Sequence, residues 1–232
     1  MGISLVIPAY NSADILSKSV KKIHKKLELI DKDFEIIIAE DGSTDGSDLI
    51  ASKLSKELEN VRYLHSPKRK GKGKAIKDAL NSARFDILAF MDVDLSTDIS
   101  CFPKLIEIVK DGADIAIGSR NLKESKIERG LKREVISKSY STLVRLLFRT
   151  RIKDFQCGFK AFRRSVLPIF LRARDDEFFW DTEVLILAER KKLKIVEMPV
   201  VWKEYKKTKI NLLKYPFKMF LSMVRFRINL ND

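Results

Sequence analysis

The sequence is poor in cysteine, with only Cys101 and Cys157 among 232 residues, so no disulfide framework is indicated and a reducing, cytosolic setting is the default. It also lacks an uncharged apolar run of about 18 residues, the length that a membrane-spanning helix needs. Residues 1–12 carry no basic segment before a short apolar run, so we expect no secretory signal. No repeat, low-complexity tract or linker divides the chain. These absences predict one domain that is soluble or lies on a membrane.

Positive charge, in contrast, is abundant: 46 Lys and Arg residues outnumber 32 Asp and Glu residues and give a formal net charge of +14. Such an excess favours an anionic partner, which is a nucleic acid, an anionic lipid or a phosphorylated small molecule. We expect no nucleic acid, because the lysines are scattered and no DNA- or RNA-binding motif occurs.

Short β-branched runs alternate with amphipathic helical patterns in the first half of the chain. Strands are expected at 3–8, 34–39, 61–65, 87–92 and 114–118, with helices at 12–30, 47–59, 72–83 and 102–110. A charged loop (123–133), a helix (134–149), a second helix (181–191), a strand (194–201) and an amphipathic stretch (212–230) follow. The pattern predicts an α/β fold, a Rossmann-like, doubly wound and mostly parallel sheet flanked by helices.

Polar residues follow the carboxyl ends of four expected strands. They are PAYN at 8–11, EDGSTD at 40–45, DVD at 92–94 and GSR at 118–120. Ligands of open α/β sheets bind beyond these ends, so we expect a site there.

Asp92 and Asp94 occupy alternate positions after an apolar strand, so their carboxylates can point to the same side. Two close carboxylates repel each other unless a cation lies between or beside them. Oxygen ligands suit Mg²⁺ or Mn²⁺, which takes further ligands from water and substrate phosphates. The alternative is that Asp94 caps the following helix and Asp92 meets a backbone amide or an arginine. The neighbouring polar strand ends favour the metal site.

Asp41 and the turn at 70–74 each allow two interpretations. Asp41 either bonds a base or ribose of a nucleotide or serves the Asp-Gly-Ser turn. GKGK at 71–74 lacks the P-loop spacing, because Ala75 follows Lys74. It either approaches a diphosphate from the start of a helix or is a solvated charge run.

The order and spacing of several motifs resemble those of inverting family 2 glycosyltransferases of the GT-A fold. They are VIPAYN (6–11), EDGSTD (40–45), KGKGKA (70–75) and DVD (92–94). GSR (118–120), QCGFK (156–160) and WDTE (180–183) are similar to motifs of the dolichyl-phosphate mannose and glucose synthases. The resemblance extends to about Tyr205.

The resemblance implies a nucleotide-sugar donor and a divalent metal. The residues implied to bind the nucleotide are Pro8, Tyr10, Asn11, Asp41, Lys74 and Asp92. Asp92, Asp94 and Ser96 would face Mg²⁺ or Mn²⁺, although some mannose synthases have glutamine where this chain has Ser96, a weaker ligand. Ser12 also departs from the pattern, since a glutamate often stands there. The QCGFK form favours UDP-glucose over GDP-mannose.

The implied acceptor is dolichyl or polyprenyl phosphate, whose dianionic phosphate needs no general base. Arg120 and Arg133 are expected to grip phosphates, and Asp94 to act through the metal. Gln156 and Asp181 are expected near the sugar or the acceptor. The product would be a β-linked lipid-phosphate sugar. The alternative, transfer to a sugar hydroxyl, needs a carboxylate base, for which Asp181 or Glu183 could serve.

The stretch 212–230 combines a polar stripe, with lysine and arginine, and a wide apolar face. It either lies in a membrane interface, as does a second candidate at 135–148, or packs on the domain. We expect residues 1–205 to form the catalytic domain and 206–232 an interfacial helix of the same domain. The protein would then lie peripherally on the cytoplasmic face of a membrane, whose anionic surface suits the charge. The sequence sets no oligomeric state.

Overall fold

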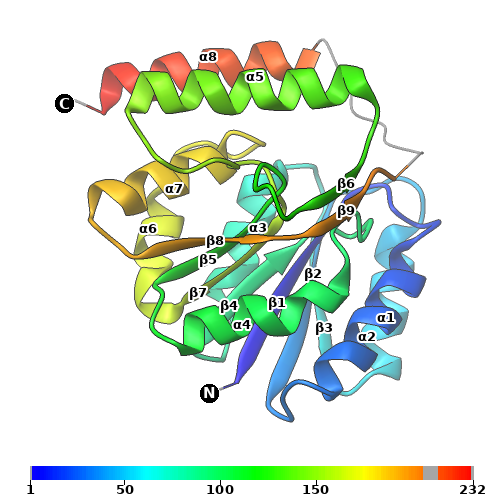
Figure 1. Cartoon of the computed structure of the whole chain (residues 1–232). Helices are drawn as coiled ribbons and strands as arrows, with labels where there is room; N and C mark the ends of the chain where they lie inside the picture. The colour runs from blue at the N-terminus through cyan, green and yellow to red at the C-terminus, as the bar shows by residue number, and fades with distance from the viewer. Residues whose placement is uncertain (1, 206–213, 231–232) are drawn as a thin grey trace.

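The computed structural model describes residues 2–205 and 214–230 of the chain. Its centre is a seven-stranded sheet with the strand order β3-β2-β1-β4-β7-β5-β8, accompanied by a small sheet of β6 and β9 (Figure 1). The strands are β1 (Ile3–Ala9), β2 (Phe34–Asp41), β3 (Val61–Ser66), β4 (Ile87–Met91), β5 (Ile115–Ser119), β6 (Lys126–Glu128), β7 (Phe159–Arg163), β8 (Ile195–Pro199) and β9 (Val201–Lys203). Only β7 runs antiparallel to its neighbours β4 and β5 in the large sheet.

Helices cover both faces of the large sheet, which is why its strands are continuously apolar. The helices are α1 (Leu16–Glu28), α2 (Ser47–Glu57), α3 (Lys72–Asn81), α4 (Phe102–Lys110), α5 (Leu131–Phe148), α6 (Leu167–Arg172), α7 (Trp180–Arg190) and α8 (Lys214–Asn229). Alternate residues of β1 serve the two faces: Ile3, Leu5 and Ile7 join the core under α1, α2 and α4, whereas Val6 joins the core under α3, α6 and α7. The predicted α/β fold with a mostly parallel sheet is confirmed.

The second half of the chain departs from the prediction in three places. The strand β7 and the helix α6 were not predicted, and the expected strand at 194–201 is two strands, β8 and β9. The chain turns at Val200, and β9 leaves the large sheet to pair with β6. The expected loop at 123–133 contains β6 and the first residues of α5. All these elements depend on partners distant in the sequence, which a local pattern does not contain.

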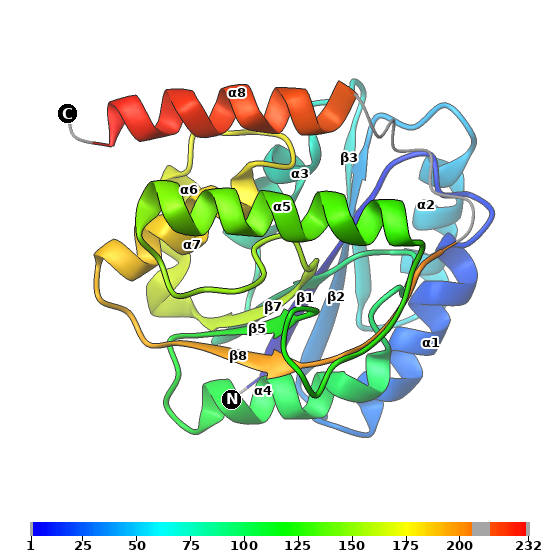
Figure 2. The same ribbon diagram turned by 45° about the horizontal axis from the view of Figure 1, so that its top comes forward.

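The helices α5 and α8 lie side by side on top of α7, as both views show (Figures 1 and 2). Met223 of α8 is buried, and the ring of Phe226 lies 5.6 Å from that of Phe148 and 5.7 Å from that of Phe179. No helix of the described segments has the length and apolar character required to span a membrane. Residues 212 and 213 of the predicted amphipathic stretch lie outside the described residues.

Candidate active site

Two adjoining cavities lie at the carboxyl edge of the sheet. We call the first, of about 350 Å³, the β1–β2 cavity; it is lined by Pro8, Tyr10, Asn11, Asp41 and Arg69, among others. The second, of about 270 Å³, is the arginine cavity, lined by Arg120, Arg129, Arg133, Tyr140, Gln156 and Trp202, among others. Lys72, Asp92, Asp94, Phe178 and Tyr205 line both cavities. These shared residues make the two cavities one continuous cleft.

Asp92 and Asp94 follow β4 and lie at the junction of the two cavities. Asp94 Oδ1 accepts the backbone N–H of Ser96 at 2.9 Å. Burial and the neighbouring Asp92 carboxylate raise the pKa of Asp94. The alternative in which Asp94 caps the next helix is wrong, because Asp98 takes that place and accepts the N–H of Ser100 at 2.8 Å.

Gly158 leaves the space that the Asp92 side chain occupies. A Cβ atom at position 158 would lie 2.0 Å from Asp92 Oδ2, a distance that no side chain could accept. The backbone N–H of Asp92 also donates to the carbonyl of Gly158 at 3.0 Å. The QCGFK motif therefore supports the Asp92 carboxylate from the antiparallel neighbour of β4.

Lys72, the first residue of α3, supplies the cation beside these carboxylates. Its Nζ lies 2.8 Å from Asp92 Oδ1 and 3.5 Å from Asp181 Oδ2. Burial acts to lower the pKa of Lys72, but the Asp92 and Asp181 carboxylates outweigh it and raise that pKa. The ammonium therefore stays charged at any physiological pH.

Asp181 lies behind the cleft, and it lines neither cavity. Its side chain is 1% exposed, and its Oδ1 lies 2.6 Å from the ammonium of Lys160, which is itself fully buried. Asp181 was expected near the sugar or the acceptor. In the structure it is buried and forms ion pairs with Lys72 and Lys160. Its contacts are those of a positioning residue.

The donor set around Asp92 and Asp94 fits Mg²⁺ or Mn²⁺. Both side chains offer carboxylate oxygens, which hard divalent cations prefer. Across residues 2–205 and 214–230, no group of three or more His, Cys, Asp or Glu side chains is placed to hold a metal. Ser96 lines the arginine cavity, and its N–H supports Asp94. Substrate phosphates and water would therefore supply the remaining ligands.

In the β1–β2 cavity, an exposed aromatic ring lies beside a buried carboxylate. Tyr10 is 44% exposed, and the guanidinium carbon of Arg69 lies 4.8 Å from its ring centroid. Asp41 is buried, and its two oxygens accept the backbone N–H groups of Lys70 at 2.7 Å and Gly71 at 2.9 Å. Asp41 thus fixes the turn that presents Lys72, in addition to lining the cavity.

Lys74 lies outside both lining sets, unlike the other residues that were expected to bind the nucleotide. Its ammonium pairs with Asp78 one turn along α3. Lys72 takes the place in the cleft instead, because Gly71 turns the chain into the helix at a φ of +110°. Any Cβ at position 71 would lie 2.3 Å from the carbonyl oxygen of Asp176. Both lysines follow a glycine, so the sequence offered no signal to choose between them.

Of the three arginines that line the arginine cavity, Arg120 and Arg133 are paired with carboxylates. Arg120 Nε and Nη2 donate to Asp154 at 2.7 and 2.9 Å, and the guanidinium lies 5.6 Å from the Trp202 ring centroid. Arg133 Nη1 lies 2.5 Å from Glu204 Oε1. Burial opposes ionisation of Asp154, but Arg120 outweighs it and holds the pKa of Asp154 below its ordinary value. Asp154 was not predicted, because only the fold brings it to Arg120.

Arg129 differs from the other two arginines, and sequence reasoning missed it. Its Nε is buried and has no hydrogen-bond partner among the residues that the structure describes. Burial and the nearby Arg120 lower the pKa of Arg129. A poorly neutralised guanidinium that lines a cavity is suited to an incoming anion.

Gln156 lines the arginine cavity as expected, and its amide is held in place. Its Nε2 donates to the carbonyl of Phe178 at 3.1 Å and to Thr182 Oγ1 at 2.9 Å. The structure thus brings together every predicted site residue except Lys74 and Asp181.

Comparison with known proteins agrees with this architecture. Residues 4–170 match the family described as Glycosyl transferase family 2. The chain is 40% identical over 216 residues to Glycosyltransferase AglD of Haloferax volcanii, covering 91% of this chain but 35% of that protein. It is 30% identical to Dolichyl-phosphate beta-glucosyltransferase ALG5D of Trichomonas vaginalis, covering 98% of this chain and 75% of that protein. The Saccharomyces cerevisiae Dolichyl-phosphate beta-glucosyltransferase is 32% identical, with 97% and 74% coverage.

Solved structures share the fold at low identity. The glucosyl-3-phosphoglycerate synthase of Mycobacterium tuberculosis, in complex with Mn²⁺, UDP and glucosyl-3-phosphoglycerate, has a TM-score of 0.70 and 18% identity. The match covers 97% of this chain and 79% of that one. At this identity the likeness shows the fold alone.

Proposed function

The chain belongs to glycosyl transferase family 2 and has the GT-A fold, and we propose that it transfers glucose from UDP-glucose to dolichyl or polyprenyl phosphate. The product would be a β-linked lipid-phosphate sugar for glycan assembly. Relatives named dolichyl-phosphate beta-glucosyltransferases support this choice of sugar and acceptor. GDP-mannose is the second donor to consider.

One observation favours a phosphate acceptor over a sugar hydroxyl: the described residues that line the arginine cavity offer no carboxylate beyond those of the metal site and of one ion pair. Of the described residues lining the arginine cavity, Asp92, Asp94 and Glu204 carry carboxylates, and Glu204 is paired with Arg133. Asp181 is buried against Lys160, and both oxygens of Glu183 accept backbone N–H groups away from the cleft. A dianionic phosphate is already a nucleophile and needs no base.

The nucleotide sugar would occupy the β1–β2 cavity. The base can stack on the exposed Tyr10 ring, and the diphosphate reaches the junction of the cavities at Lys72. There the ammonium neutralises charge that develops on the departing nucleotide. A bound Mg²⁺ or Mn²⁺, held by Asp92 and Asp94, would act as a Lewis acid and stabilise the same developing charge.

The acceptor phosphate would enter the arginine cavity. Arg129 and Arg133 offer guanidinium donors there, while Arg120 is fixed against Asp154 and supports the positive potential. A phosphate oxygen then attacks the anomeric carbon opposite the departing nucleotide. This in-line displacement converts an α-linked donor into a β-linked product.

The lipid part of the acceptor implies a membrane surface, for which α5 and α8 are suited. Large apolar side chains remain exposed on both helices: Leu131, Val135, Ile136, Leu143 and Leu146 on α5, and Phe217, Phe220, Leu221, Val224 and Ile228 on α8. The two helices lie side by side (Figure 2), so these side chains can enter the interface together. We place the protein on the cytoplasmic face, where nucleotide sugars are available.

A donor screen tests the proposal. The protein is incubated with dolichyl phosphate, Mg²⁺ or Mn²⁺, and radiolabelled UDP-glucose or GDP-mannose, and the organic phase is counted. Label from UDP-glucose in an alkali-stable, acid-labile lipid is expected. If no common donor gave label in the organic phase, the proposal would be rejected. Label in a hydroxyl-bearing glycan would support the alternative acceptor.

A further inference from the structure

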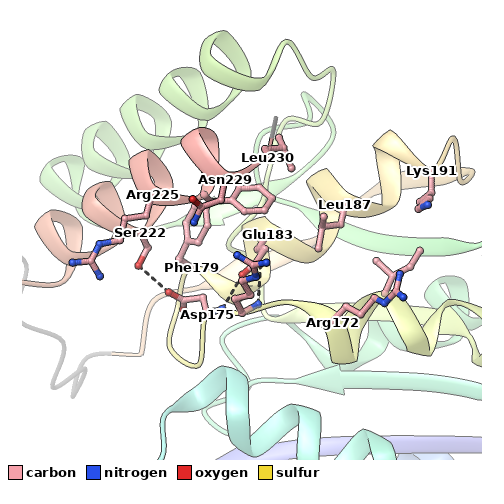
Figure 3. Close-up of a pocket in the computed structure, with 13 residues that line it drawn as sticks. Arg172, Asp175, Phe179, Glu183, Leu187, Lys191, Ser222, Arg225, Asn229 and Leu230 are labelled. Atoms are coloured by element: carbon pink, nitrogen blue, oxygen red, sulfur yellow. Dashed lines mark hydrogen bonds between the residues drawn. The ribbon is translucent and has the colours of Figure 1, made fainter. Parts of the chain in front are cut away.

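A third cavity, of about 470 Å³, lies between α6, α7 and α8 and shares no lining residue with the active-site cleft (Figure 3). We call it the α6–α8 cavity. Ser222, Arg225 and Asn229 line it from α8. Facing them are Phe179, directly before α7, and Glu183 and Leu187 of α7. The transfer reaction proposed above uses none of these side chains.

The charge in the α6–α8 cavity is strongly unbalanced towards cations. Arg172, Arg174 and Arg225 line it and are exposed, and in the described part of the chain no ion pair joins any of the three to a carboxylate. Lys191 lines the same cavity at its far end. Four cations therefore surround a space that a compact anion could enter.

The two carboxylates in this cavity are already engaged. Glu183 accepts the backbone N–H groups of Arg174 at 2.8 Å and Asp175 at 2.9 Å. Asp175 accepts the hydroxyl of Ser222 at 2.8 Å through one oxygen and the backbone N–H groups of Glu177 and Trp180 through the other. These bonds tie the carboxylates to the protein and leave the guanidinium groups for a ligand.

The remaining walls of the cavity are apolar, and they lead to the exposed face of α8. Ile169, Phe179, Leu187, Phe226 and Leu230 line the cavity. Val224 and Ile228, which are 36% and 64% exposed, flank Arg225 along the same helix. A ligand that fits this arrangement has an anionic head and a hydrocarbon body.

We propose that the α6–α8 cavity binds the phosphate head group of an anionic membrane phospholipid, with Arg172, Arg174 and Arg225 as its cationic ligands. The acyl chains would lie along the exposed apolar side chains of α8. This site is separate from the acceptor site, so it would hold a lipid that is not consumed. The proposal rests on the membrane association in the proposed function, but not on the transfer reaction.

Such a lipid would also brace the active site. The segment between α6 and α7 contributes Asp175 and Phe179 to the α6–α8 cavity and Phe178 to both active-site cavities. Met219 of α8 lines the arginine cavity one turn before Ser222. A head group that binds α8 to this segment therefore stabilises one wall of the acceptor site.

Vesicle binding with charge-matched variants tests the proposal. The probe is cosedimentation of the full chain with phosphatidylglycerol vesicles, compared with phosphatidylcholine vesicles. R172Q/R174Q/R225Q removes three positive charges at the cavity, and K25Q/K32Q/K56Q removes three exposed charges on and near α1 and α2, far from α8 (Figure 1). We expect the first variant to bind phosphatidylglycerol more than about tenfold more weakly, and the control to change binding less than about threefold. Equal losses in the two variants would overturn the site and leave only diffuse attraction.

A soluble probe distinguishes a lipid from free phosphate. Monomeric dihexanoyl phosphatidylglycerol is titrated into isotope-labelled protein, and backbone amide shifts are followed by NMR, with inorganic phosphate as the second ligand. Saturable shifts at Arg174, Ser222 and Asn229 with the lipid, and weaker shifts with phosphate, support the proposal. Equal responses would assign a free-phosphate site instead, and the absence of saturable shifts would reject the proposal. Transfer activity of the wild-type protein is measured separately, so failure here leaves the proposed function testable.

Discussion

The β1–β2 cavity and the arginine cavity meet at Lys72, Asp92 and Asp94, yet different kinds of interaction hold their charged groups. In the first, backbone amides fix the carboxylate of Asp41, on a strand of the parallel sheet. In the second, backbone amides hold Asp154 as well, but Arg133 and Glu204 are joined through their side chains alone, between α5 and the segment after β9. A carboxylate fixed by backbone cannot be displaced without unfolding the turn, whereas side-chain pairs can exchange partners. Under the proposed function, the donor side of the cleft is the more rigid one and the acceptor side is the more adaptable one.

The largest loss of transfer activity is expected for a substitution at the junction of the two cavities, because the junction serves both sides of the cleft. Asp94→Ala removes one of two carboxylates that fit the metal, and we expect transfer to fall about a thousandfold. The label-transfer assay with UDP-glucose and dolichyl phosphate measures it, and circular dichroism checks that the fold persists. Full activity in both the variant and the chelator-treated wild type would show that the metal assignment is wrong.

The two lysines of the basic turn provide a matched pair. Lys72→Met removes the ammonium 2.8 Å from Asp92 and should lower kcat about a hundredfold. Lys74→Met removes an ammonium that pairs with Asp78 outside the cleft, so kcat should stay within about twofold of the wild type. Steady-state kinetics of the two variants decide the assignment. The reverse order would return the nucleotide-binding role to Lys74.

Substitutions on the two sides of the cleft should each change the KM of a different substrate. Arg133→Gln removes a guanidinium that would donate hydrogen bonds to the acceptor phosphate in the arginine cavity. The substitution should raise KM for dolichyl phosphate about tenfold. Tyr10→Ala removes the stacking ring and should raise KM for UDP-glucose about tenfold. Each variant should leave the other KM almost unchanged. If both variants raised the same KM, the division of the cleft into donor and acceptor sides would be wrong.

The smallest effect concerns the stability of the metal-free protein. Burial and Asp92 raise the folded-state pKa of Asp94 above its ordinary value of 3.8, so the charged carboxylate destabilises the fold at neutral pH. Asp94→Asn cannot ionise and should have the higher Tm with chelator present. Because protonation relieves the wild type, this advantage should shrink as the pH falls through the raised pKa towards 3.8. Calorimetry across this range measures it, and a Tm difference independent of pH would contradict the shift.

The β1–β2 side could be predicted from the sequence because its parts are local. Each strand of the parallel sheet is an apolar run followed directly by its polar residues, as in Pro8 to Asn11 or Asp92 to Asp94. The topology then brings these ends to one edge. Even here, the choice between Lys72 and Lys74 depended on the turn at Gly71, which Asp41 fixes from another strand.

The arginine side could be predicted only in part. Arg120, Arg133 and Gln156 were found through the family resemblance, but Asp154 and Arg129 were missed. The role of Asp154 depends on its contact with Arg120, which lies 34 positions earlier in the chain. β7 was missed because its alternation includes Lys160, a charge that a buried strand accepts only when a partner such as Asp181 is present.

The burial of Lys160 has a consequence for folding. Its ammonium is satisfied by the carbonyls of Phe155 and Cys157 and by the Asp181 carboxylate of α7. If β7 paired with β4 one residue out of register, the Lys160 side chain would turn to the opposite face, among apolar residues under α4. Asp181 would then keep only the more distant ammonium of Lys72, at 3.5 Å. A misregistered chain would therefore carry the uncompensated charge of Lys160 in its interior. The ion pair between Lys160 and Asp181 therefore favours the observed register of β7 over its neighbours.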